Sequence, residues 1–213
     1  MQGLLSYIRS ELPIWIVQVP VILVVITIHE YGHAWVAWKL GDNTPVATGR
    51  LSLNPFRHLD PLGTLALLIF HVGWARPVMI DFSVFKHPRR DTALVSLAGP
   101  AANFASGMVA YVLLLLLRGS ATAVTQLTYV YTVLRTLVEF SVALGVFNLL
   151  PIPPLDGSKA FLAVFFKRPE RFLYDRAVDI YGTIVLLALL WFNIIGGILN
   201  TVLGFILNTV LKL

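Results

Sequence analysis

The sequence predicts an all-α polytopic membrane protein, a single domain over residues 1–213 with roughly 5–6 transmembrane or re-entrant helices. Its composition and its pattern both predict this class. Hydrophobic residues make up 57% of the chain and charged residues only 13%, whereas soluble domains average about 25% charged residues. The apolar residues gather in long runs, and a membrane-spanning helix needs roughly 20 of them.

The first long run, residues 13–40, contains His29-Glu30-Tyr31-Gly32-His33. Residues four apart lie on one face of a helix, so His29 and His33 can direct two imidazoles at one metal ion, usually zinc. Glu30 lies about 100° further round the helix, where it can take a proton from water rather than bind the ion. The alternative is three side chains that pair with neighbours. The apolar flanks favour the metal, because ionisable groups at membrane depth need a compensating partner.

The stretch after this run is turn-rich and polar. Weak alternation predicts short strands at 47–53 and 78–82, a small membrane-associated β-strand region. His58 and Asp60 are candidate auxiliary groups at the mouth of the site, with a solvated loop pair as the alternative. The apolar run 62–72 is short for a full span and is predicted to be re-entrant or half-buried.

Two further spans are predicted at 92–117 and 126–150. In the first of them, Gly99, Asn103 and Gly107 are spaced four apart and share one helix face. Small residues there permit close helix approach, and the amide can form a hydrogen bond across the interface. Asn103 is therefore either such an interhelical group or a polar contact that faces the metal site.

The segment from Asn148 to Gly157 cannot continue a helix, because three of its four residues at 151–154 are prolines. Irregular backbone at membrane depth is tolerated where protein buries it or where it lines a cavity. Asp156 is thus a candidate third ligand, which would leave one zinc position open, as catalytic sites require. The alternative is an N-cap for the helix that follows.

The C-terminal apolar stretch, residues 180–213, exceeds one span and is interrupted at Asn193, Gly196 and Gly197. It forms either one long tilted helix or two shorter pieces. The chain has no cysteine, which excludes disulfides and thiolate ligands.

The motifs together resemble the site-2 protease family of intramembrane zinc metalloproteases. Those that carry the resemblance are His29-Glu30-x-x-His33, Gly99-Pro100-x-x-Asn103 and Asn148-x-x-Pro151-x-Pro153-x-Leu155-Asp156-Gly157. Arg50-Leu-Ser-Leu-Asn-Pro, His58-x-Asp60-Pro and Gly73-Trp-Ala-Arg-Pro are similar to its short bacterial and archaeal branch, without a PDZ or CBS domain.

The resemblance implies zinc on His29, His33 and Asp156, with Glu30 as general base. It also implies substrate or oxyanion contacts for Asn148 and, less directly, for Asn103.

The function implied is hydrolysis of peptide bonds within or near transmembrane segments of membrane-protein substrates, in regulated intramembrane proteolysis. Two alternatives stay open. A metal transporter would need polar residues spaced through several spans, and a non-catalytic zinc-binding scaffold would have no need for Glu30.

The net charge of +5 points to membrane orientation rather than nucleic acid. Most of the 16 lysines and arginines fall in loops that the predicted spans return to one side. We assign that side to the cytoplasm. The resemblance to the bacterial and archaeal branch implies a multi-pass protein of a prokaryotic cell membrane. His33 precedes Lys39 by about 9 Å of helix, so the site should lie nearer the cytoplasmic side.

Overall fold

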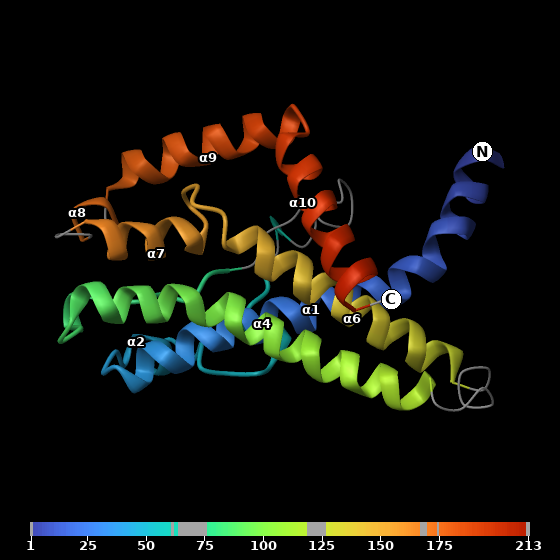
Figure 1. Cartoon of the computed structure of the whole chain (residues 1–213), viewed down its shortest axis with the longest axis horizontal. Coiled ribbons are helices and arrows are strands. Elements are labelled where there is room, and N and C mark those ends of the chain that lie inside the picture. Colours follow the sequence, from blue (N-terminus) through green and yellow to red (C-terminus); the bar gives the residue numbers. More distant parts are fainter. Residues whose placement is uncertain are drawn as a thin grey trace.

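The computed structural model describes residues 2–60, 62–63, 76–118, 127–166, 170–173 and 175–211, and this part of the chain contains helices but no β-strand. Three long helices form the centre of the molecule (Figure 1). They are α1 (Gln2–Lys39), α4 (Pro88–Arg118) and α6 (Thr128–Asn148). Helix α4 packs against both α1 and α6, which places the face that carries Gly99 and Asn103 against the His-Glu motif of α1.

Close packing of α1 on α4 depends on a glycine inside the His-Glu motif. A Cβ atom added at Gly32 would lie 2.7 Å from the carbonyl oxygen of Ala98 and 2.9 Å from the Cβ of Ala102. Any larger residue would therefore push the two helices apart. Further along α4, Ala110 and Leu114 pack with Val138 and Val142 of α6 in a buried apolar cluster.

Three helices are long and apolar enough to cross a membrane within the described residues: Trp15–Lys39, Pro88–Leu117 and Thr128–Asn148. A fourth span results if α9 (Arg176–Trp191) and the following helical residues Ile194–Thr209 count as one bent pair. The prediction of 5–6 transmembrane or re-entrant helices is therefore not met in this part of the chain. The predicted re-entrant run 62–72 lies almost wholly outside the described residues.

The C-terminal stretch consists of two pieces, which was one of the two predicted forms. Helices α9 and α10 (Ile194–Gly204) meet at a bend of 71°. Asn193 sits at the bend with a φ of 55°, the left-handed conformation that Asn tolerates better than most residues. The last turns, η3 (Phe205–Val210), are π-helical. This pair covers the irregular segment 149–155, where Leu155 packs with Leu186 and Ile195.

The predicted strand at 47–53 is wrong. Helix α2 (Thr44–Ala47) enters it, and Gly49 turns the chain with a φ of 67°. Local bonds satisfy the backbone there, because Thr48 N–H donates to Thr44 O and Arg50 N–H donates to Pro45 O. Short alternation cannot outweigh such turn bonds.

The predicted strand at 78–82 is also wrong. Residues 76–81 have no regular secondary structure, Asp81 is extended, and the 3₁₀ turn η2 (Phe82–Val84) follows. The N–H groups of Val78 and Asp81 donate to carboxylates from the α1 region rather than to a neighbouring strand. Within the part of the chain that the structure describes, residues 78–81 have no ladder partner, so they do not form a strand.

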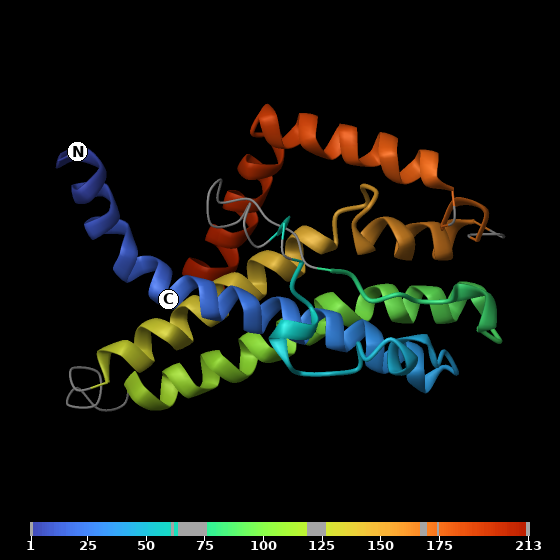
Figure 2. The ribbon, with the colours of Figure 1, turned by 180° about the vertical axis from the view of Figure 1, so that it is seen from behind.

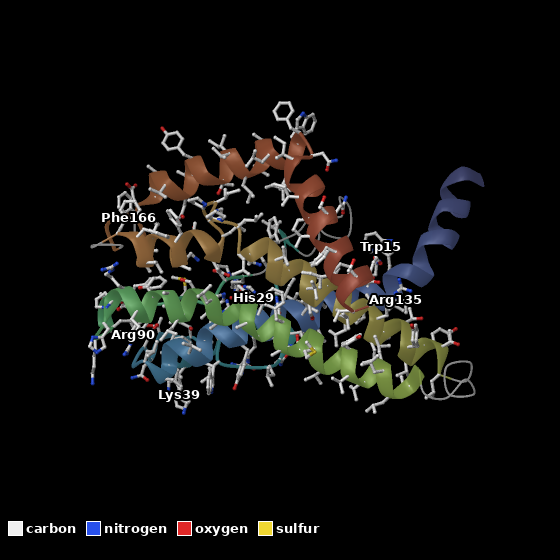
Figure 3. The ribbon with its side chains drawn as sticks, viewed as in Figure 1. Trp15, His29, Lys39, Arg90, Arg135 and Phe166 are labelled. Atoms are coloured by element: carbon white, nitrogen blue, oxygen red, sulfur yellow. The ribbon has the colours of Figure 1, made fainter. Side chains whose placement is uncertain are left out.

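The remaining elements are η1 (Pro55–Arg57), α7 (Asp156–Phe165) and α8 (Glu170–Leu173). The short turn η1 contacts α1, and α8 lies at the end of the bundle where α1 stops (Figure 1). From behind, the extended segment that leads into α4 runs beside α1 (Figure 2). Lys39 and Arg90 lie at this end, and Arg135 lies toward the opposite end (Figure 3). Arg135 forms an ion pair of 2.9 Å with Glu139, one turn further along α6.

Candidate functional site

Three buried side chains from two helices converge at one point between α1 and α7. His29 Nε2 and His33 Nε2 each lie 3.0 Å from Asp156 Oδ2, and the two nitrogens are 3.1 Å apart. Zinc–ligand distances of about 2.0–2.1 Å in a tetrahedron separate neighbouring ligand atoms by roughly 3.3 Å. The observed triangle is close to one face of such a tetrahedron, so these residues fit a zinc ion.

The hydrogen bonds on the far side of each imidazole support the same reading. His33 Nδ1 lies 2.7 Å from the carbonyl oxygen of Val95, which can only accept, so Nδ1 carries the proton and a neutral ring leaves Nε2 bare. His29 Nδ1 lies 3.0 Å from Asn103 Nδ2. The Asn103 Oδ1 atom is buried without a partner among the described residues, and turning the amide so that its nitrogen and oxygen exchange places would let Oδ1 accept an Nδ1 proton when Nε2 binds metal. Both rings then have the outer partner typical of metal ligands.

The space for the ion is kept open by Gly99 of α4. A Cβ atom added there would lie 2.3 Å from His33 Nε2 and 2.7 Å from His29 Nε2. Even an alanine would therefore fill the position beside both nitrogens. The sequence predicted that Gly99 permits close helix approach, but in the structure its more specific effect is to leave room at the metal site.

Asp156 is the first residue of α7, and its carboxylate is not used as a helix cap. Leu155 occupies the N-cap position, without a capping side chain. Oδ2 faces the two histidines, while Oδ1 lies 3.5 Å from Lys159 Nζ, one turn along the helix. Burial by itself raises the pKa of Asp156, but His33, His29 and Lys159 outweigh it and hold the pKa well below its usual range. The carboxylate is thus ionised, as a metal ligand must be.

A cavity of about 470 Å³ opens beside these ligands. Glu30 lines it, and its Oε2 accepts a hydrogen bond of 2.9 Å from the backbone N–H of Val78. The other lining residues come from the extended segment, α4 and the C-terminal half of the chain: Pro77, Val78, Ile80, Phe82, Val95, Ser96, Asn148, Pro154, Lys159 and Asp179. A carboxylate next to three metal ligands in a cavity is the arrangement that hydrolytic metal sites use.

Comparison with known proteins identifies the family. Residues 18–192 match the model of peptidase family M50. The chain belongs to peptidase family M50. The predicted resemblance to site-2 proteases is thereby confirmed, and the M50 chain is an integral membrane protein and a zinc metalloprotease.

Relatives of this M50 chain carry matching names. It is 39% identical over 159 residues to "Putative zinc metalloprotease YwhC" of Bacillus subtilis, which covers 74% of this chain and 71% of that one. It is 34% identical over 148 residues to "Putative zinc metalloprotease Rip2" of Mycobacterium tuberculosis, covering 65% and 53%. It is 27% identical over 158 residues to "Zinc metalloprotease MJ0392" of Methanocaldococcus jannaschii, covering 72% and 36%. The chain therefore spans about half of Rip2. No solved structure matches it.

The other residues predicted for the M50 site divide into one inside the cavity and three outside it. Asn148 lines the cavity, and its Nδ2 donates to Leu144 O at 3.0 Å. Asn103 is fully buried behind His29 and is absent from the lining. His58 is also buried, with Nε2 2.8 Å from Ser52 O. Asp60 accepts a bond from the N–H of Gly63. Neither His58 nor Asp60 lines the cavity formed by the described residues.

Several lining residues of the M50 cavity were missed from the sequence. Ser96 Oγ is buried without a partner among the described residues, and Ser96 is three positions before Gly99. Lys159 is three positions after Asp156. Helical spacing could have found both. Arg50 was cited only as part of a motif. Burial and the charge of Arg76 lower the pKa of Arg50, and the charge of Glu30 acts in the opposite direction.

Proposed function

We propose that this M50 zinc metalloprotease is an intramembrane protease, which hydrolyses peptide bonds within or near transmembrane segments of membrane-protein substrates. The observation that carries the proposal is the position of the site. His29, Glu30 and His33 belong to a candidate membrane span and face a cavity of about 470 Å³. The peptide bond to be cleaved must therefore enter the cavity between the helices.

In this proposal His29, His33 and Asp156 hold the zinc ion. Bound there, zinc would lower the pKa of water and polarise the scissile carbonyl. Glu30 takes the proton from the attacking water and passes it to the leaving amine. His33 is held for its task by Val95 O and His29 by Asn103, so neither ring needs to turn when substrate arrives.

Asn148 is the residue that we assign to the substrate or the developing oxyanion. One N–H of its amide donates to Leu144 O, which leaves the second N–H and the carbonyl oxygen for a peptide group in the cavity. Asn103 has no such opportunity, because it is buried behind His29. We assign Asn103 to the orientation of that imidazole.

The site is reached from the cytoplasmic side in this proposal. Lys39 and Arg90 lie at one end of the bundle (Figure 3), and lysines and arginines mark cytoplasmic ends. His33 is six residues from Lys39 on the same helix. Single cysteines can be placed cleanly in this cysteine-free chain. A cysteine at Arg90 should react with an impermeant thiol reagent only in opened cells, whereas labelling from outside intact cells would reverse the topology.

Cleavage of a panel of single-span membrane proteins by the purified chain in lipid discs tests the activity. Products cut inside or beside the apolar segment are expected, and the double variant His29→Ala/His33→Ala should be inactive. Cleavage confined to soluble unfolded peptides, with every membrane substrate intact, would contradict the intramembrane assignment.

A further inference from the structure

We propose that the backbone N–H of Val78 is a positioning group for the general base: it holds one oxygen of Glu30 so that the other faces the reaction. The inference rests on the proposed function of Glu30. Val78 contributes to the site through its main chain, so no motif of side chains in the sequence could indicate it.

The contact itself is short and partly buried. Val78 N lies 2.9 Å from Glu30 Oε2, and Val78 is only 9% exposed. A carboxylate has two oxygens, so a donor on Oε2 leaves Oε1 to take a proton. Without this donor the Glu30 carboxylate would have no hydrogen-bond partner among the described residues. Hydrogen bonds to charged groups are roughly twice as strong as neutral ones, which makes this donor an effective restraint.

The segment that presents this N–H is itself fixed on both sides. Before Val78, the N–H of Arg76 donates to His58 O at 2.9 Å, and Pro77 has a restricted φ. After Val78, the N–H of Asp81 donates to Asp42 Oδ2 at 2.9 Å. Asp42 is 1% exposed. The extended chain is thus anchored on two sides of the N–H that meets Glu30.

Apolar packing connects the same segment to the metal ligands. Ile80 and Phe82 pack on a buried cluster of Ala37, Phe85 and Val95. Val95 is also the residue whose carbonyl oxygen accepts the bond from His33. One cluster therefore sets the place of a metal ligand and the place of the segment that restrains the base. This explains how the base and the ligands can keep a fixed relation although they depend on different parts of the chain.

Proline at position 78 tests the inference, because it removes the N–H while the chain can stay extended. Met79→Pro is the matched control: Met79 is 63% exposed, lies outside the cavity lining, and its N–H has no partner among the described residues. For Val78→Pro we expect full zinc content, an unchanged KM and a kcat about tenfold to a hundredfold lower. Met79→Pro should keep its kcat, and Val78→Ala, which retains the N–H, should lose far less than Val78→Pro.

An equal loss of kcat in both proline variants, or an unchanged kcat in zinc-loaded Val78→Pro, would overturn the inference. A measurement without substrate covers the case in which Val78→Pro fails to fold. Hydrogen exchange at the Val78 amide should be faster in Glu30→Ala than in Glu30→Gln, since glutamine keeps an acceptor oxygen. Equal exchange rates in the two variants would also overturn the inference. This readout is independent of proteolysis, so it separates failure of the hydrogen bond from failure of the proposed activity.

Discussion

The two sides of the zinc site are positioned in different ways. On the helical side, His29, His33, Gly99 and Asn103 repeat at intervals of four residues along α1 and α4, so helix geometry brings them together. On the irregular side, residues 76–81 and 149–155 have no periodic pattern, and hydrogen bonds and packing across the fold set their place. If the proposed roles hold, metal binding depends mainly on the helices, and orientation of the base and the substrate depends mainly on the irregular segments.

Gly99→Ala should have the largest effect on the helical side. The added Cβ would occupy the space beside both histidine nitrogens, so zinc should be almost completely lost. Gly107→Ala on the same helix is the control, since its Cβ would meet Ser141 Cβ at 3.1 Å and Ser141 Oγ and Val138 O at 3.9 Å, and neither histidine. Elemental analysis of the purified variants measures both. Full zinc in Gly99→Ala would show that the ion does not lie between these nitrogens.

Asp156 joins the two sides, because it follows the irregular segment and contacts both helical ligands. As a ligand it should tolerate neither Asn nor Ala, and zinc affinity should fall strongly in both variants. As a helix cap, Asn would replace it almost freely. Competition with a chromogenic chelator compares the zinc affinities of the two variants. Wild-type affinity in Asp156→Asn would indicate that Asp156 is a helix cap and not a ligand.

Asn103→Leu should have a smaller effect, since it removes only the outer partner of His29. Loss of such partners weakens metal binding by about 10–100-fold. Asn103→Asp, which can present a carboxylate oxygen to Nδ1, should bind zinc more tightly than the leucine variant. Chelator competition again gives the affinities. If the two variants bind zinc equally, the amide does not orient the ring.

His58→Ala should have the smallest effect at the site. The imidazole is buried but bonds to Ser52 O, outside the cavity lining. Removing it should destabilise the fold by about 1–3 kcal/mol and leave zinc affinity unchanged. Thermal unfolding and chelator competition on the same sample separate the two quantities. A large loss of zinc affinity with an unchanged unfolding temperature would indicate that His58 contributes to the metal site.

The sequence predicted the helical side well for a physical reason. A spacing of four residues fixes a shared helix face whatever the rest of the fold does, so the His-Glu motif and the spans that carry it could be predicted. The sequence left open whether residues 180–213 form one helix or two, and the structure has two that meet near Asn193. Asp156 was predicted to join the histidines because the prolines before it exclude a helix, and the structure brings its Oδ2 to within 3.0 Å of both rings.

The irregular side was predicted poorly because its partners are distant in sequence. The strands at 47–53 and 78–82 were inferred from alternation, but alternation does not say what the N–H groups will bond. Val78 is 48 residues from Glu30, and no local pattern indicates that pair. Contact with the substrate was one of the roles predicted for Asn103, because the sequence could not show that His29 lies between Asn103 and the cavity.

Zinc content and proteolysis measured together on Glu30→Gln test the central claim most directly. Three other residues are proposed to hold the ion, and Glu30 is proposed only to transfer the proton. The variant should therefore keep about one zinc per chain, as the wild type does, and lose cleavage of a membrane substrate. Cleavage at the wild-type rate by zinc-loaded Glu30→Gln would contradict the role of Glu30, and loss of zinc would make it a ligand instead.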